Sequence, residues 1–309
     1  MMGKPVIKAA HLKITDHLIL GVTKAHADTG IVPFKTFDLE TRPMVGWNQV
    51  GDAMKDGSVD VAFMLAPMAI DLFHAGVGIK LSMFAHKTGS IFVKNKKANI
   101  QKLEDFKGKM IAIPYQLSVH NMLLHQLFTR HGMSVGAGKD VALEVMAPSQ
   151  MPEAIQYDED GEIGGFIVAE PFGSQAIKEG YAEEMYLSRD LWPKHPCCVV
   201  VIKEKLIDSH PEAVQELTQS LVNSGKFVKD NPQGAIKIGA QFLSQKEEVV
   251  MHVLTDTPDR VLISSELFPV LSELEKIQEY MCNTMGVMHS KINLEKFVES
   301  SFAKNAGAT

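Results

Sequence analysis

A short polar turn in the middle of the chain joins a predicted strand to a predicted helix. The strand spans Met110–Pro114, the turn spans Tyr115–Ser118, and a strongly apolar helix follows over Val119–His131. A helix N-terminus carries a positive partial charge and unpaired N–H groups, so it suits an anion or an oxygen-rich group. A serine in this position is also the usual N-cap, which stabilises a helix by about 1 kcal/mol. We expect Gln116 and Ser118 to contact a ligand, with Ser118 also capping the helix.

A carboxylate ends another predicted strand. Glu170 follows the buried run Gly164–Ala169 and precedes Pro171. A charge in such a place is costly unless it is paired or solvated. A cationic group of a ligand, a neighbouring lysine or arginine, or water in a cleft would each satisfy it. We expect Glu170 to lie at a ligand cleft.

Further candidates follow strands in the first half of the chain. In open α/β sheets, ligands bind in the crevice outside the carboxyl ends of the strands. Asp16 and His17 follow a strand predicted at Val6–Leu12, where Asp16 also suits the N-cap of the next helix. The other expected ligand contacts are Trp47 in a predicted helix, the turn residues Ala66 and Pro67, and Thr88. For Trp47, plain core packing is the alternative.

Histidines recur near predicted strand ends. They are His11, His17, His86 and His120, out of twelve in the chain. A metal or metal-chelate site is one interpretation of this pattern. We favour ordinary polar residues that line a cleft, with His120 among the ligand contacts, and we expect neither a metal nor a cofactor.

The sequence shows no catalytic cluster. There is no phosphate loop, no GxGxxG after a strand, no HExxH, no CxxC pair and no GxSxG elbow. Ser118 and His120 are two residues apart on one predicted helix and do not face each other. Three cysteines form no disulfide framework, and Cys197 and Cys198 are expected to be buried thiols. We therefore expect a protein that is not an enzyme.

Helices and short apolar strands alternate in two successive units, and a helical segment follows from Pro211 onward. This order is typical of mostly parallel sheets that are covered on both faces. The first unit includes a strand predicted at Phe34–Leu39. The two units are expected to be joined near Lys94–Lys97 and near His195–Val201. Neither segment is rich in Gly, Pro or Ser, as a flexible linker would be, so we predict two extended strands that cross between the units. Two lobes joined in this way form a hinge that closes over a ligand.

The composition excludes several classes of protein. The 309 residues are 45% hydrophobic, and 31 Lys and Arg against 37 Asp and Glu give a formal net charge of -6. A mildly acidic chain without a basic patch is a poor match for a phosphate backbone, so no nucleic acid is expected as a partner. No apolar run approaches the roughly 18 residues that a membrane span needs. The N-terminus has no signal peptide, so we expect either a cytoplasmic protein or one whose leader was removed.

Several stretches resemble the solute-binding proteins of ABC importers of the nitrate/sulfonate/bicarbonate class, which includes taurine and thiamin-precursor binders. The matching stretches are Trp47–Met68 with its Gly57-Ser58-Val59-Asp60-Val61-Ala62 and Ala66-Pro67-Met68 motifs, Leu103–Lys109, Ala169–Phe172, and His195–Val200. The resemblance covers most of residues 5–245.

The resemblance implies a type II periplasmic-binding-protein fold with the ligand cleft between two α/β lobes. Lobe I would comprise residues 1–93 and 200–309, and lobe II residues 94–199. A monomer would clamp a sulfonate, taurine, nitrate, bicarbonate or aminopyrimidine and deliver it to a membrane permease. The expected location is the periplasm, or the cell surface as a lipoprotein, after loss of a leader. By position in the family, the cleft residues are Asp16, Trp47, Ala66 with Pro67, Gln116 with Ser118, and Glu170.

Two alternatives stay open at this point. One is an enzyme on the same fold, similar to the pyrimidine synthases of thiamin biosynthesis or the dehydratases of the menaquinone route. Its reactive residue would be a cleft histidine (His17, His86 or His120) or the pair Cys197 and Cys198. The other is a cytoplasmic ligand sensor that signals to a partner protein.

Overall fold

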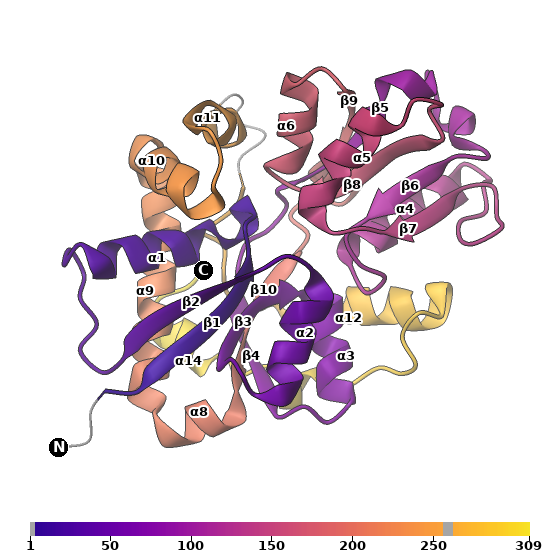
Figure 1. Cartoon of the computed structure of the whole chain (residues 1–309). Coiled ribbons are helices and arrows are strands. Elements are labelled where there is room, and N and C mark those ends of the chain that lie inside the picture. The colour runs from indigo at the N-terminus through magenta and orange to yellow at the C-terminus, as the bar shows by residue number, and fades with distance from the viewer. Residues whose placement is uncertain (1–3, 256–261) are drawn as a thin grey trace.

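Two mixed β-sheets organise the chain into two lobes (Figure 1), in a computed structural model that describes residues 4–255 and 262–309. The order of strands in the first sheet is β2 (Asp38–Met44), β1 (Val6–Leu12), β3 (Val61–Leu65), β10 (Cys198–Lys203) and β4 (Ile79–Phe84). The order in the second sheet is β7 (Ala142–Val145), β6 (Met110–Ile113), β8 (Ile163–Ala169), β5 (Ser90–Asn95) and β9 (Ala182–Leu187). The two-lobed α/β fold predicted from the sequence is confirmed.

The sheets are mixed, although the sequence analysis predicts mostly parallel ones. β10 runs antiparallel to both β3 and β4, and β5 runs antiparallel to both β8 and β9. Each of these two strands enters its sheet directly from the other lobe. It therefore starts at the edge where the parallel strands end and must run in the opposite direction.

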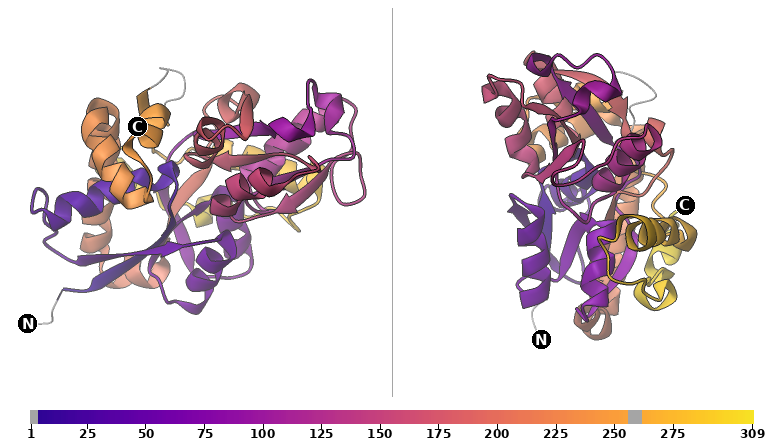
Figure 2. Two further views of the ribbon diagram at one scale, coloured as in Figure 1. Left: turned by 45° about the horizontal axis from the view of Figure 1, so that its top comes forward. Right: turned by 90° about the vertical axis from the view of Figure 1, so that its right-hand side faces the viewer.

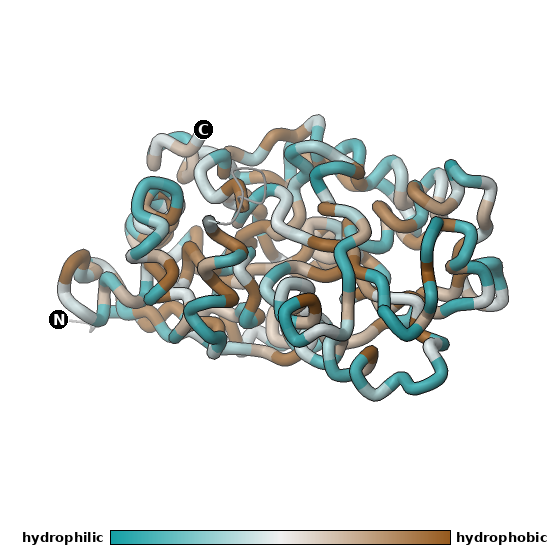
Figure 3. The backbone as a smooth tube through the Cα atoms, turned by 90° about the horizontal axis from the view of Figure 1, so that it is seen from above, coloured by the Kyte–Doolittle hydropathy of each residue, from teal (hydrophilic) through white to brown (hydrophobic). Residues whose placement is uncertain are grey.

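The first sheet is covered by helices on both faces, which explains why β3 is buried along its whole length. In Figure 1, α1 and α9 lie on one side of it and α2 and α3 on the other. The helices of this lobe are α1 (Leu18–Asp28), α2 (Trp47–Asp56), α3 (Ala66–His74), α8 (Glu204–Ser209), α9 (Pro211–Asp230), α10 (Pro232–Leu243), α11 (Glu247–Thr255), α12 (Leu271–Tyr280), α13 (Leu294–Phe297) and α14 (Ser301–Asn305). Figure 3 shows the apolar segments running through the interior of the molecule, with hydrophilic turns outside.

The position of the second strand differs from the prediction. A strand is predicted at Phe34–Leu39, whereas β2 begins at Asp38 and pairs in parallel with β1 up to Met44. The apolar residues that suggested a strand, Phe34 and Phe37, instead pack against each other in the preceding loop, with ring centroids 4.1 Å apart. β2 is an edge strand that pairs with β1 alone, so it tolerates the polar sequence that follows.

The second lobe packs four short helices against its sheet. They are α4 (Val119–Arg130), α5 (Met151–Tyr157), α6 (Phe172–Lys178) and α7 (Ser188–Leu191). Phe92, Phe106 and Phe128 form an aromatic cluster in its core, with ring centroids 5.4–6.4 Å apart. β9 is not predicted from the sequence, because its residues are half exposed at an edge of this sheet.

Three segments of chain meet where the lobes join. Residues 85–89 connect β4 to β5, and Lys87 forms antiparallel bridges with both Pro196 and Ile263. The first crossing therefore precedes β5, and the prediction that it lies at Lys94–Lys97 is wrong because β5 belongs entirely to the second sheet. The boundaries of the lobes at 93/94 and 199/200 stay a prediction.

The C-terminal helices of the first lobe also contact the second. The Tyr280 hydroxyl at the end of α12 lies 2.9 Å from Nδ1 of His125 on α4. On the other side of the hinge, Lys178 on α6 pairs with Glu248 on α11 at 3.3 Å. The two lobes thus contact each other on two sides of the hinge. Figure 2 shows the ribbon from two further directions.

Candidate functional site

A buried ion pair lies beside the hinge. After β1, the 3₁₀ turn Thr15–His17 places Asp16 against the first crossing segment, where its Oδ2 lies 2.9 Å from Nε2 of His86. Both side chains are fully buried. Burial raises the pKa of Asp16 to about 6, against the opposing effect of His86. Burial alone would lower the pKa of His86, but the Asp16 carboxylate raises it to about 10. The two groups are therefore both charged between about pH 6 and pH 10.

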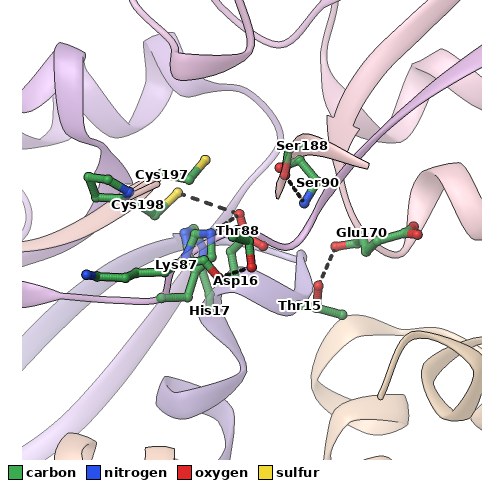
Figure 4. Close-up of polar contacts among 12 residues, drawn as sticks. Thr15, Asp16, His17, Lys87, Thr88, Ser90, Glu170, Ser188, Cys197 and Cys198 are labelled. Atoms are coloured by element: carbon green, nitrogen blue, oxygen red, sulfur yellow. Dashed lines mark hydrogen bonds and ion pairs between the residues drawn. The ribbon is translucent and has the colours of Figure 1, made fainter. Parts of the chain in front are cut away.

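Two adjacent cysteines face this pair (Figure 4). The Cys198 thiol donates toward Asp16 Oδ2 at 3.9 Å, and Cys197 Sγ lies 4.0 Å from Nε2 of His120. The neighbouring Cys198 thiol, His120 and His86 hold the pKa of Cys197 well below the ordinary value. Burial and the adjacent Cys197 raise the pKa of Cys198 well above it. Both cysteines are free and buried, as expected from the sequence.

His120 connects this group to the second lobe. It lies in the first turn of α4, and its Nε2 is 2.8 Å from the hydroxyl of Ser90, the first residue of β5. A third imidazole, that of His195, is also buried here, and burial lowers its pKa to about 4. The hinge site, meaning Asp16, His86, His120, Cys197 and Cys198, thus takes residues from both lobes and from two crossing segments.

Buried polar atoms without a hydrogen-bond partner in residues 4–255 and 262–309 occur throughout this site. They are Asp16 Oδ1, His86 Nδ1, His120 Nδ1 and His195 Nε2, with His17 Nε2 and Trp47 Nε1 nearby in the first lobe. Each unpaired buried donor or acceptor costs about 1–3 kcal/mol. The arrangement supplies one anionic acceptor and several imidazoles that can donate or accept.

Glu170 does not point its carboxylate freely into a cleft. The carboxylate accepts hydrogen bonds from the backbone N–H and the hydroxyl of Ser174, at 2.9 and 2.6 Å, and so caps the start of α6. Its backbone oxygen accepts two hydrogen bonds from Thr15 of the other lobe. Glu170 therefore joins the lobes through its main chain.

The turn before α4 mainly serves the helix. Ser118 Oγ accepts from the backbone N–H of Asn121 at 3.1 Å and donates to the Tyr115 carbonyl at 2.7 Å, which is the capping role expected of it. Gln116 is exposed, and its carbonyl accepts from the Asn121 amide. Neither side chain belongs to the hinge site.

The remaining expected residues lie around the hinge site. Trp47 is buried with its ring edge-on to His17, whose Nδ1 bonds the backbone of Leu12. Burial holds the pKa of His17 well below its usual range. Ala66 and Pro67 begin α3, and the Ala66 N–H donates to the Cys197 carbonyl at 3.0 Å.

Thr88 and Gly89 shape the first crossing segment. Thr88 is a non-glycine residue with a φ of 57°, and its N–H donates to the His195 carbonyl at 2.9 Å. Gly89 has a φ of +91°, and a Cβ there would lie 2.7 Å from Leu262 and 3.1 Å from Asp16 Oδ1. Asp16 can approach the hinge this closely because residue 89 is a glycine.

A cavity of about 310 Å³ opens between the lobes next to β1. Its apolar walls come from both lobes: Leu12, Ile14, Pro43, Met44 and Val45 on one side, and Pro148 and Phe172 on the other, with Lys13 and Ser149 as polar residues. This cavity is the open part of the cleft, whereas the hinge site is closed.

His86, Cys197 and Cys198 are residues of the hinge site that were not among the expected ligand contacts. The sequence contained a partial indication for His86, because it follows a predicted strand. For Cys197 and Cys198 the only indication was that they are adjacent in sequence. Their proximity to Asp16 depends on two crossings between the lobes, which no local pattern reveals.

Comparisons with known proteins agree with this architecture. The sequence profile described as the NMT1-like family matches residues 25–244. The nitrate import ATP-binding protein NrtC of Synechocystis is 26% identical over 243 residues, which cover 68% of this chain and 36% of that protein. The taurine-binding periplasmic protein of Escherichia coli is 26% identical over 210 residues, 65% of this chain and 63% of that protein. The chain thus matches less than two thirds of either relative.

A solved structure covers nearly the whole chain. The ligand-binding component of an ABC-type import system from Staphylococcus aureus, determined with zinc bound, is similar with a TM-score of 0.86 at 24% identity. The match covers 98% of this chain and 99% of that one. This likeness establishes the two-lobed fold of the chain.

Proposed function

Because the chain belongs to the NMT1-like family, we propose that it is the solute-binding component of an ABC importer. In this function it holds a small solute between its lobes and delivers it to a membrane permease. The named relatives act in nitrate import and in taurine binding, which supports this class of function. No described helix is long and apolar enough to cross a membrane.

The observation that carries the proposal is the set of unpaired buried polar atoms at the hinge. Asp16 Oδ1, His86 Nδ1 and His120 Nδ1 come from both lobes and have no hydrogen-bond partner within the described ranges. A solute that bonded to them would offset their desolvation only while the lobes are together. Solute binding would therefore favour the closed form that a permease recognises.

The donor and acceptor pattern favours a polar solute that both accepts and donates hydrogen bonds. The imidazoles of His86 and His120 can donate to an oxyanion, whereas the Asp16 carboxylate accepts from a donor. An amino sulfonate such as taurine offers both kinds of group. A simple oxyanion, nitrate or bicarbonate, and an aminopyrimidine are the other candidates.

We assign direct contact with the solute to Asp16, His86 and His120. His17, Trp47, Ala66 and Pro67 would support the site without touching the solute. His17 and Trp47 pack edge-on against each other, and the Ala66 N–H bonds the Cys197 carbonyl. Gln116, Ser118, Thr88 and Glu170 would act at the edge of the cleft by capping helices and joining the lobes. From the sequence alone, all of these residues except His86 were expected to contact the solute equally.

The site of action and partner follow from the same proposal. A relative named as periplasmic supports a periplasmic location for this chain. The partner would be the permease of an ABC importer, and the protein would act on it as a monomer.

A thermal-shift screen tests the function. Nitrate, bicarbonate, taurine, alkanesulfonates and aminopyrimidines are added separately at a large excess. A ligand at one hundred times its Kd stabilises the folded state by about 2.7 kcal/mol, which corresponds to several degrees in Tm. Calorimetric titration then gives the Kd for the wild type and for Asp16→Asn, which should bind at least about tenfold more weakly.

The chemical state of the bound compound decides between a binding protein and an enzyme. Cys197, with its lowered pKa and two imidazoles nearby, is the feature that would favour catalysis. Recovery of the compound unchanged after prolonged incubation supports the importer component. Consumption of the compound, abolished in Cys197→Ser, would replace the proposal with an enzyme.

A further inference from the structure

The donor atoms of Asp16, Cys197 and Cys198 form a compact buried group. One oxygen and two sulfurs all lie within 4.8 Å of one another, and all three residues are buried. Asp16 comes from the turn after β1, whereas the cysteines come from the crossing segment that leads into β10. The fold thus brings three potential anionic ligands together at the centre of the protein.

We propose that this group, with an imidazole as fourth ligand, binds one zinc-class transition-metal ion. Neighbouring ligand atoms in a tetrahedral zinc site with thiolate, imidazole and carboxylate ligands lie about 3.6 Å apart. The separation between Asp16 Oδ2 and Cys198 Sγ is 3.9 Å, and that between Cys197 Sγ and His120 Nε2 is 4.0 Å. A contraction of a few tenths of an ångström around the ion would bring both to the expected value.

His120 would complete the ligand set by a shift of its ring, because only the donor atoms of Asp16, Cys197 and Cys198 already lie within 4.8 Å of one another. Its Nε2 already faces the Cys197 sulfur, and its contact with the Ser90 hydroxyl is the one it would exchange for the ion. Because α4 belongs to the second lobe and Asp16 to the first, the ion would link the two lobes directly.

His86 acts as a positioning residue. Its Nε2 lies 2.9 Å from Asp16 Oδ2, in the arrangement in which an imidazole orients a carboxylate ligand. Outer contacts of this kind usually change metal affinity by about 10- to 100-fold.

The donor atoms themselves favour a transition-metal ion. Two sulfurs, one nitrogen and one oxygen suit zinc and cobalt, whereas magnesium and calcium prefer oxygen ligands.

The donor atoms are buried, so the site would take the bare ion rather than an ion in a bulky chelate. This assignment does not depend on which solute the cleft holds. The ion would face Asp16 Oδ2, which leaves Oδ1 for the solute of the proposed function.

Cobalt binding tests the proposal on the full chain. The reduced protein is stripped with a chelator and titrated with Co²⁺ alone, and Zn²⁺ is then added as a competitor. We expect one equivalent of Co²⁺, a near-ultraviolet band of thiolate-to-cobalt charge transfer, intense visible bands of tetrahedral cobalt, and loss of all these bands when Zn²⁺ is added. Mg²⁺ and Ca²⁺ should leave the spectrum unchanged.

Matched variants locate the ion. Cys197→Ser, Cys198→Ser and Asp16→Asn should each weaken Co²⁺ binding at least about 100-fold, and His86→Gln about 10- to 100-fold. Cys282→Ser is the control, because Cys282 is a free cysteine outside the site and its loss should change nothing. Circular dichroism confirms that each variant is folded, and the spectrum of the wild type is informative without any variant.

Three results would overturn the metal site. They are a spectrum without thiolate bands, weak binding at several equivalents, or equal loss of binding in Cys282→Ser. The solute screen, repeated on stripped and on metal-loaded protein, separates this proposal from the preceding one. Stoichiometric metal without any solute response would leave the metal site standing and count against the importer function.

Discussion

The Thr15 N–H and hydroxyl both donate to the backbone oxygen of Glu170, at 2.8 and 2.9 Å. Thr15 belongs to the first lobe and Glu170 to the second, and both are buried. Glu170 in turn caps α6 through Ser174. A single pair of residues thus connects the turn that carries Asp16 with the start of a helix in the other lobe.

Replacing Thr15 by valine should weaken closure of the lobes. Thr15→Val keeps the shape and the backbone N–H but removes the hydroxyl donor, which costs about 1 kcal/mol. If closure is coupled to solute binding, Kd should rise about fivefold. Calorimetric titration measures the change, and Thr29→Val, which removes an exposed hydroxyl bonded to its own helix, serves as control. Equal Kd values for Thr15→Val and the wild type would contradict the role given to this contact.

The His86–Asp16 pair should make stability depend on alkaline pH. The pKa of His86 is raised from 6.5 to about 10, so the folded state holds this proton more tightly than the unfolded state. Its contribution is fully present below pH 6.5 and is lost as pH rises through about 10. Urea unfolding of the wild type and of His86→Gln at pH 7 and pH 10 checks this. The difference in the free energy of unfolding between the two proteins should shrink at the higher pH, and a constant difference would rule out a protonated His86.

A methyl group at residue 89 should disturb the hinge. Gly89→Ala meets an unfavourable φ and also clashes with Leu262 and Asp16. Gly57→Ala is a matched control, because its φ is +76° but nothing lies within 4 Å of the added Cβ. Overpacking costs about 1–3 kcal/mol, so Gly89→Ala should lose that much more stability than the control in urea unfolding. Similar losses would show that backbone strain alone acts at the hinge.

Loss of the Ser118 hydroxyl should lower stability but not affinity for the solute. Ser118→Ala removes the N-cap of α4, at a cost of about 1 kcal/mol. Asn231→Ala, which removes the N-cap of α10 far from the hinge site, should cost about the same. Thermal unfolding gives both values. Because both hydrogen bonds of Ser118 Oγ are used within its turn, the Kd for a solute should change less than twofold in either variant.

The sequence predicted most of the individual strands and helices, but it said less about which strands pair and which side chains meet. Strand and helix periodicity correctly predicts β1, α4 and β8, because these elements are buried and their apolar pattern is strong. It fails for β2 and β9, two of the four edge strands, whose exposed residues form no apolar run.

The same distinction applies to the candidate site. A rule about strand ends was enough to select Asp16 and His120, since each immediately follows a strand or its turn. It did not predict that these residues meet Cys197 and Cys198, about 80 to 180 positions away in sequence. The bridge between Lys87 and Ile263 could not be predicted either. The sequence around Ile263 has no periodicity that marks it as a segment returning to the hinge.

The position of β10 has a consequence for how the chain folds during synthesis. The second sheet is built from the continuous stretch between Ser90 and Leu187, so it can be completed while the ribosome is still translating the rest. The first sheet cannot, since β10 separates β3 from β4 and is made only after the entire second lobe. The second lobe, which is inserted in the sequence between β4 and β10, should therefore fold first. Until β10 is synthesised, β3 and β4 stay unpaired on the sides that β10 will occupy.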